Sequence, residues 1–187
     1  MAKINTCIFI SGTGTNLKKI LLNSNNYNFP IKIKLIVSNN KDAKGIVLAK
    51  KWSIPVLIID KSSIINEEKT LKILKNYNVS LILLAGYMKI LSKKFLRSFG
   101  RKILNIHPSL LPKFKGLNTF VRMLKAKEKS CGCTVHYVND KLDAGKIVLK
   151  KYFFISKTDN FLTLKKKTQL LEHKAYSEAI YRIFMYS

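Results

Sequence analysis

The sequence predicts an α/β fold in which a mostly parallel, twisted sheet is covered by helices on both faces. Apolar, β-branched runs such as Ile4–Ile10 alternate with helix-like segments such as Ala43–Trp52 as far as residue 107. The run Leu81–Ala85, "LILLA", is apolar throughout, as expected of a strand that is buried on both faces. This alternation is typical of a parallel sheet built from β–α–β units.

Each element of the first part has its own signal. Ile31–Val37, "IKIKLIV", alternates as a strand does, and Pro55 precedes a short third strand. Thr15 or Asn16 is expected to cap the first helix. The strands are expected at Ile4–Ile10, Ile31–Val37, Val56–Ile59, Leu81–Ala85 and Lys102–Ile106. The helices are expected at Leu17–Leu22, Ala43–Trp52, Glu67–Tyr77 and Phe95–Phe99.

The pattern changes after the fifth strand. A helix is expected at Thr119–Lys127, and two longer strands at Cys133–Val138 and Lys146–Ile155, joined by the turn-rich "NDKLDAG". A long helix follows from Phe161 to about Met185. With no repeat or linker in view, we expect one domain over residues 1–187, with an N-terminal half at 1–104 and a C-terminal half at 105–187.

Composition narrows the class of protein. Hydrophobic residues make up 47% of the 187 residues, which is in the globular range. No apolar run approaches the roughly 18 residues that span a membrane, and the start, "MAKINTCIFISGTG", is not typical of a signal peptide. A cytoplasmic protein without a membrane partner is therefore expected. The three cysteines suggest neither a disulfide framework nor a metal site.

The charge allows two interpretations. Lysine and arginine number 35 against 10 acidic residues, a net charge of +25. Such a charge suits nucleic-acid binding. However, the lysines are spread along the whole chain, and aromatic residues are not interleaved with them as in single-strand binders. We therefore attribute the charge to compositional bias and expect no nucleic-acid partner.

The segment "SGTGTN", residues 11–16, follows the first strand, at the edge of the sheet where ligands bind in open α/β folds. Its glycines allow a tight turn and a close approach to a ligand. A helix N-terminus follows, and its free N–H groups suit a phosphate. The segment is neither G-x-G-x-x-G nor a Walker loop, so a plain tight turn is an equal alternative.

A second polar segment, "NIHPSLLP", follows the fifth strand. Asn105 and His107 are two residues apart, so their side chains point to the same side of the strand. An amide and an imidazole side by side can stabilise a developing oxyanion. A histidine on a strand can also be an ordinary core residue. With "SGTGTN" and "AGYMKIL", this segment is expected to converge on one cleft.

Asp143 is the candidate partner for His107. A nearby carboxylate favours the imidazolium form of histidine and would raise its pKa. Asp143 lies in the link between the last two strands, "NDKLDAG". From the spacing alone, an aspartate that merely completes a turn with Gly145 is equally good.

Taken together, these segments resemble a known family. "SGTGTN", "AGYMKIL", "NIHPSLLPKFKG", "TVHYVNDKLDAG" and "QLLEH" are similar, in order and spacing, to the phosphoribosylglycinamide formyltransferases. The resemblance runs from residue 4 to about residue 184. It implies a three-layer Rossmann-like formyltransferase fold with a β-hairpin-like C-terminal part and a long C-terminal helix. It also implies formyl transfer from 10-formyltetrahydrofolate to the amine of glycinamide ribonucleotide in purine biosynthesis, without a metal.

The resemblance assigns roles to single residues. The implied catalytic residues are Asn105, His107 and Asp143. The implied residues for glycinamide ribonucleotide are Gly14, Thr15, Asn16 and Glu172. The implied folate-binding residues are Met88, Lys89, Ile90, Leu91, Asn105, Asn139, Asp140, Lys141, Leu142 and Asp143. The expected partners are these small-molecule substrates, and a monomer or a homodimer is expected.

The chain also departs from the family pattern. Asn118 stands where a histidine is usual, and Lys115 where a proline is usual. Lys89 stands where arginine is common, which keeps the charge but loses the bidentate fork. An arginine that often follows the third strand has no match, and the nearest positions, Ser62 and Ser63, are neutral. The C-terminal tail is short. These changes concern the reaction rate and the substrate affinity more than the type of reaction.

Three rivals remain. Methionyl-tRNA formyltransferase would suit the positive charge but carries a further C-terminal domain. Formyltetrahydrofolate hydrolase shares the trio but carries a regulatory domain. A basic nucleic-acid-binding protein with a decayed active site would fit the charge and Asn118. All three accord less well with the sequence than the glycinamide ribonucleotide enzyme does.

Overall fold

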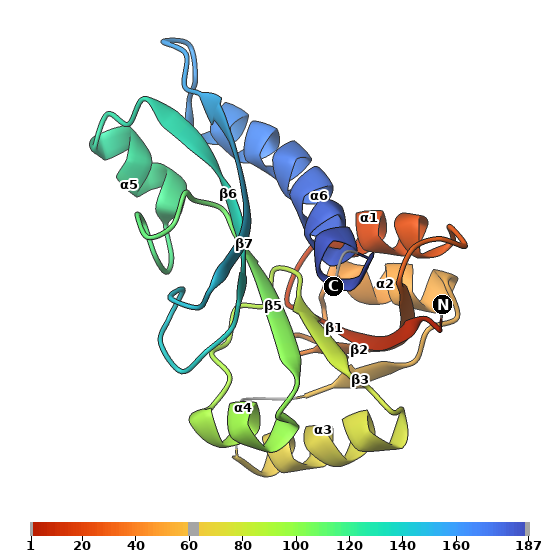
Figure 1. Ribbon diagram of the computed structural model, residues 1–187. Helices are drawn as coiled ribbons and strands as arrows, with labels where there is room; N and C mark the ends of the chain where they lie inside the picture. The colour runs from red at the N-terminus through yellow and green to blue at the C-terminus, as the bar shows by residue number, and fades with distance from the viewer. Residues whose placement is uncertain (1, 60–63, 186–187) are drawn as a thin grey trace. The chain divides into compact units, whose positions relative to one another are not determined.

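The computed structural model describes residues 2–59 and 64–185 (Figure 1). It divides into two compact units, residues 1–104 and 105–187, and each is described by itself. The boundary falls inside a strand, β5 (Lys102–His107), which begins in the first unit and ends in the second. Ser62 and Ser63, the neutral positions without the expected arginine, lie outside the described residues.

The first unit is built on a parallel sheet with the strand order β3-β2-β1-β4. Strand β1 pairs in parallel with β2 on one side and β4 on the other, and β2 pairs in parallel with β3. All four strands therefore end at the same edge. The strands are β1 (Ile4–Ile10), β2 (Ile31–Ser38), β3 (Val56–Ile58) and β4 (Leu81–Leu84).

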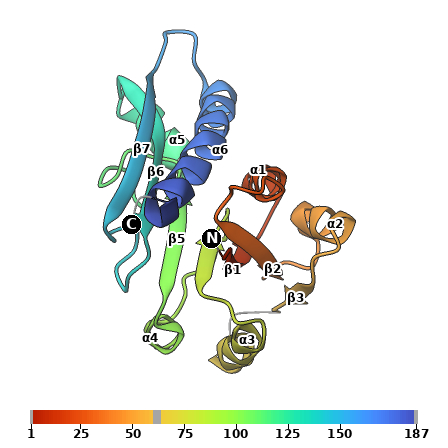
Figure 2. The same ribbon diagram turned by 45° about the vertical axis from the view of Figure 1, so that its right-hand side comes forward.

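Helices cover both faces of this sheet. Figures 1 and 2 show α1 and α2 on one side of the strands and α3 and α4 on the other. Residues at the centre of the sheet are buried on both faces, which explains their continuous apolar sequence: Ile8 and Leu83 are fully buried and lie opposite each other. The helices are α1 (Thr15–Ser24), α2 (Lys44–Lys51), α3 (Ile64–Asn76) and α4 (Lys93–Phe99).

The second unit is organised around an antiparallel strand pair and a long helix. Strands β6 (Ser130–Tyr137) and β7 (Ile147–Phe154) pair in antiparallel fashion, and the end of β5 lies next to β6. Helix α6 (Phe161–Met185) runs along the pair and packs on both strands (Figure 1). Helix α5 (Thr119–Lys125) contacts α6.

The two faces of the β6–β7 pair are covered differently. On one face, the Cys131 thiol contacts the hydroxyl of Thr168 on α6 at 3.3 Å, and Lys151 pairs with Glu178 of the same helix at 2.6 Å. On the other face, the Thr134 hydroxyl donates to the Ser109 carbonyl at 2.7 Å. This bond holds the segment that follows β5 against β6, and so places the residues after His107.

The predicted elements are found with small shifts of their ends, and the α/β fold with a hairpin and a long last helix is confirmed. The predicted cap of the first helix is wrong. Helix α1 begins at Thr15, so Thr15 and Asn16 lie in its first turn, and the capping position is Gly14. Gly14 has φ 73°, in the left-handed region that favours glycine, and no side chain caps the helix.

None of the helices in the described part of the chain is both long and apolar enough to cross a membrane.

Gly145 fixes the course of the hairpin link. A Cβ atom at this position would lie 1.7 Å from the carbonyl oxygen of Tyr137, the last residue of β6. We therefore expect Gly145→Ala to lower the free energy of unfolding by about 3 kcal/mol, because the backbone must move to relieve the clash. Urea denaturation measures this, with Gly12→Ala as the control, since a Cβ at Gly12 meets no atom within 4 Å. Equal stability of the two variants would contradict the prediction.

Candidate active site

The three predicted catalytic residues come together in the second unit. Asn105 and His107 lie at the end of β5, and both side chains reach Asp143, in the link between β6 and β7. The Nδ1 atom of His107 lies 3.3 Å from Asp143 Oδ2, and the Nδ2 atom of Asn105 lies 3.5 Å from Asp143 Oδ1. His107 and Asp143 are buried. The two-residue spacing thus places both side chains on one side of the strand, while their catalytic roles remain predictions.

Both ring nitrogens of His107 face acceptors. Its Nε2–H group donates to the Phe114 carbonyl at 2.9 Å, because a carbonyl can only accept. Nδ1 therefore carries a lone pair when the ring is neutral, and it faces the Asp143 carboxylate. A proton taken up at Nδ1 would be held by that carboxylate. The arrangement can receive one proton at a defined atom.

The pKa of His107 is lowered by burial of the ring, and the hydrogen bond to Phe114 and the Asp143 carboxylate only partly offset this effect. The expected influence of the carboxylate is present, but the net shift is downward. We expect the His107 ring to titrate below its usual value of 6.5 in a ¹⁵N–¹H NMR titration of the imidazole. The unfolded chain then binds this proton more readily, so stability falls as the pH drops below 6.5. Titration at or above 6.5 would contradict this.

Asp143 is held as a carboxylate by donors from several sides. Burial acts to raise its pKa, but the adjacent His136 side chain, the hydrogen bond from the Gly116 backbone and the adjacent His107 ring lower it by more, so the pKa lies below its usual value. The Gly116 N–H donates to Oδ2 at 2.8 Å. The backbone of Asp143 has φ 47°, a left-handed conformation that aspartate tolerates better than most residues. Both its charge and its backbone therefore suit an aspartate.

His136 belongs to the same cluster and was missed in the sequence. Its Nδ1–H group donates to the Tyr137 carbonyl at 2.8 Å, so its Nε2 accepts from Asn105 Nδ2 at 3.2 Å. The same Nε2 lies 3.6 Å from Asp143 Oδ1. His136 thus fixes the Asn105 amide with its NH₂ group toward Asp143. The available signal was its place at the end of a buried strand, directly before the loop that carries Asp143.

The loop after β5 is held by Arg122 of α5. Its guanidinium donates to the Lys115 carbonyl at 2.6 Å and lies over the Phe114 ring, 5.5 Å from its centre. Asn118, at the position of the usual histidine, has φ 57° and precedes the first residue of α5. Asparagine is among the residues that adopt this left-handed conformation most readily. Asparagine at position 118 is therefore compatible with the backbone conformation there.

The predicted phosphate loop lies in the first unit. Gly14 packs directly on α2, because a Cβ atom there would lie 2.8 Å from Cα of Gly45. The Gly45 N–H donates to the Gly12 carbonyl at 3.1 Å, which fixes the loop from the other side. Thr15 and Asn16 follow in the first turn of α1, where backbone N–H groups lack carbonyl partners within the helix. This geometry is compatible with an anion site, and phosphate binding by Gly14, Thr15 and Asn16 stays a prediction.

The predicted folate residues differ in exposure. Met88 and Ile90 are 66% and 76% exposed, whereas Leu91 is buried and packs in the core of the first unit. In the second unit Asn139, Asp140, Lys141 and Leu142 are all exposed. Exposed apolar side chains next to polar ones suit contact with a flat ring ligand.

Glu172, the predicted ligand of glycinamide ribonucleotide, is buried on α6. Burial raises the pKa of Cys133 to about 12, and the charge of Glu172 contributes to that shift. Glu172 is thus a buried carboxylate on the helix that packs on β6.

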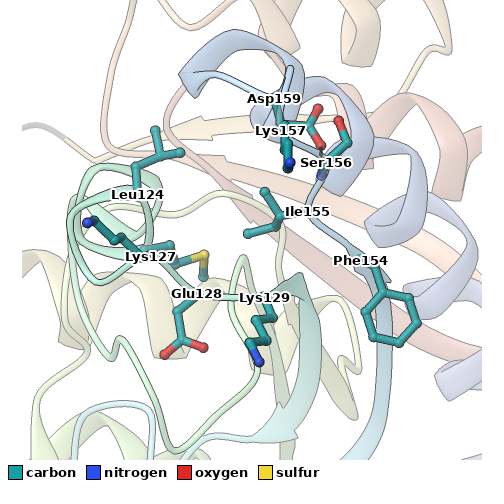
Figure 3. Close-up of a pocket in the computed structure, with 10 residues that line it drawn as sticks. Leu124, Lys127, Glu128, Lys129, Phe154, Ile155, Ser156, Lys157 and Asp159 are labelled. Carbon is teal, nitrogen blue, oxygen red and sulfur yellow. Dashed lines mark hydrogen bonds between the residues drawn. The ribbon is translucent and has the colours of Figure 1, made fainter.

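A pocket of about 630 Å³ opens elsewhere in the second unit (Figure 3). Its lining includes Lys127, Lys129 and Phe154 but none of the predicted site residues. Its acidic members, Glu128 and Asp159, are paired with Lys113 and Lys167. The cluster around Asp143, rather than this pocket, therefore marks the candidate site. Across the described residues, no group of three or more His, Cys, Asp or Glu side chains is placed to hold a metal ion.

A parallel sheet covered by helices is typical of Rossmann-like folds, and the cluster of Asn105, His107 and Asp143 lies at the end of a strand, where such folds bind ligands. The family model described as formyl transferase matches residues 4–180. The chain belongs to the formyl transferase family. The predicted family and enzyme class, a one-carbon formyltransferase, are thereby confirmed.

Named relatives agree with this family. Phosphoribosylglycinamide formyltransferase from Haemophilus influenzae is 41% identical over 90% of this chain and 82% of its own length. The human trifunctional purine biosynthetic protein adenosine-3 is 34% identical over 95% of this chain, which spans 18% of that protein. Glycinamide ribonucleotide transformylase 1 from Symbiobacterium toebii has a similar structure, with a TM-score of 0.93 and 34% identity over 98% of this chain and 88% of its own.

Proposed function

We propose that this protein transfers the formyl group of 10-formyltetrahydrofolate to the amine of glycinamide ribonucleotide. The products are formylglycinamide ribonucleotide and tetrahydrofolate, and the step belongs to purine biosynthesis. The observation that carries the proposal is the cluster of Asn105 with the buried His107 and Asp143 in a chain 41% identical to a phosphoribosylglycinamide formyltransferase. A cytoplasmic location, a monomer or homodimer and the absence of nucleic-acid partners remain predictions.

The chemistry needs one bond formed, one bond broken and one proton moved. The amine nitrogen attacks the formyl carbon, and a tetrahedral oxyanion forms. The bond from that carbon to N10 of the folate then breaks, and a proton passes from the amine nitrogen to N10. His136 fixes the orientation of the Asn105 amide, and the Nδ2–H group that reaches Asp143 Oδ1 at 3.5 Å can donate to the oxyanion in exchange for that contact.

The proton can be held between His107 and Asp143. At neutral pH the lowered pKa of His107 leaves Nδ1 free to accept a proton, and the ionised carboxylate at 3.3 Å stabilises the resulting imidazolium. The pair thus keeps the proton near the reacting atoms during the transfer. His107 Nε2–H can serve the oxyanion only by exchanging the Phe114 carbonyl for it.

The phosphate of glycinamide ribonucleotide is assigned to Gly14, Thr15 and Asn16, and Glu172 is assigned to the rest of that substrate. The exposed residues of 88–90 and 139–142 are assigned to the folate, with Leu91 supporting them from the core.

A formyl-transfer assay on the purified protein tests the proposal. The donor is a 10-formyl folate analogue whose absorbance changes on deformylation, and glycinamide ribonucleotide is the acceptor. We expect an absorbance change that requires the acceptor. A change without the acceptor would indicate a hydrolase, and transfer to methionyl-tRNA in its place would indicate the tRNA enzyme. Folded protein with no change would contradict the proposed function.

A further inference from the structure

Ser11 lies at a junction of three strand ends in the first unit. It directly follows β1 and is the first residue of the predicted phosphate loop, residues 11–16. Its hydroxyl donates to Oδ1 of Asn39, the residue after β2. The same hydroxyl oxygen accepts from the backbone N–H of Met88, in the segment after β4, at 2.8 Å. One side chain thus joins the ends of β1 and β2 to the segment that follows β4.

The hydroxyl is oriented for this task. A serine hydroxyl has one hydrogen to donate, and here Asn39 receives it. The remaining lone pairs are thereby directed away from Asn39, toward the Met88 N–H. Asn40 adds a second tie, since its Nδ2 donates to the Ser11 carbonyl at 3.2 Å. Ser11 is therefore fixed from the β2 side and, in turn, fixes Met88.

The segment that Ser11 holds has few other anchors. Gly86 has φ 75° and open space around it, and Met88 and Ile90 are exposed. The Tyr87 ring packs edge-on against Phe9, and Leu91 is buried at the far end. Between these two apolar contacts, the Met88 N–H group donates a hydrogen bond to the Ser11 hydroxyl. The phosphate loop, by contrast, has its own support from Gly45.

We propose that Ser11 is a positioning residue that sets the folate segment, Met88–Leu91, relative to the phosphate loop. The inference rests on the proposed function, because the roles of the two segments come from it. Removing the hydroxyl releases the Met88 backbone but leaves the contacts of Gly12 and Gly14 with Gly45 in place. We therefore expect Ser11→Ala to weaken the binding of the folate and to leave the binding of glycinamide ribonucleotide unchanged.

The test compares Ser11→Ala with the wild type in the formyl-transfer assay, with KM measured for each substrate. Loss of one hydrogen bond predicts a KM for the formyl folate analogue raised about threefold to tenfold, and a KM for glycinamide ribonucleotide unchanged within about twofold. Ser11→Thr, which keeps the hydroxyl, is expected to restore the folate KM. Ser24→Ala is the matched control, since it removes a hydroxyl that donates to the Leu21 carbonyl of the same helix, in the same unit.

An equal rise in both KM values, an unchanged folate KM, or failure of Ser11→Thr to restore it would overturn the proposal. Calorimetric titration with the folate analogue distinguishes failure of the Ser11 proposal from failure of the proposed function. If the wild type binds the analogue without transferring the group, the proposed function fails, and weaker binding by Ser11→Ala still supports the role of Ser11. If the wild type binds no folate analogue, both proposals fail.

Discussion

Replacing His107 by alanine is expected to lower kcat by about 100-fold or more, the usual cost of losing an acid–base or oxyanion-stabilising group. The variant loses the nitrogen that faces Asp143 and so the place where a proton is held during transfer. It also leaves the Phe114 carbonyl without its ring donor. Steady-state kinetics with saturating folate analogue and glycinamide ribonucleotide measure the effect.

Folding of the His107→Ala variant is checked by circular dichroism, because the ring is buried and its loss leaves a cavity. The Kd of each substrate, measured by calorimetry, should stay close to that of the wild type, because His107 is proposed to act on the reacting atoms rather than to hold the substrates. Undiminished turnover in a folded His107→Ala variant would show that His107 has no part in the chemistry.

The Asp143→Asn variant is the second case, also with an expected loss of about 100-fold or more in kcat. Asparagine has nearly the same shape and tolerates the left-handed backbone at φ 47°. It cannot carry the charge that stabilises a proton on His107, and its NH₂ group conflicts with the Gly116 N–H or with Asn105. The loss therefore reports on charge and hydrogen bonding rather than on backbone strain.

Asp159→Asn is the matched control for this variant. Asp159 is also a carboxylate with a lowered pKa, about 2, owing to its hydrogen bonds with Lys167 and Ser156. It lies just before α6 and is not among the predicted site residues. Turnover should be kept in Asp159→Asn and lost in Asp143→Asn. If the two variants retain the same activity, the assignment of Asp143 is wrong.

Local rules explain what could be predicted from the sequence. The alternation of side chains along a strand was enough to place Asn105 and His107 on one side, and turn residues marked the link that carries Asp143. Continuous apolar runs identified the buried strands. Each of these signals depends on neighbours within a few residues.

The features that were missed depend on contacts distant in the sequence. His136 reaches Asn105 only because β6 lies next to β5. The Phe114 carbonyl reaches His107 because Arg122 and Thr134 hold the intervening loop. The first helix was expected to be capped by Thr15 or Asn16, but packing of Gly14 against Gly45 determines its start.

The three cysteines give each unit its own reporter of opening. Cys7 lies in the first unit, Cys131 and Cys133 in the second, and all are free and fully buried. Burial raises the pKa of each thiol, so the reactive thiolate is scarce as long as the structure is closed. A thiol reagent therefore modifies these residues only when the surrounding strands separate. The rate at Cys7 and the rate at the Cys131–Cys133 pair would measure the local stability of the two units in one experiment.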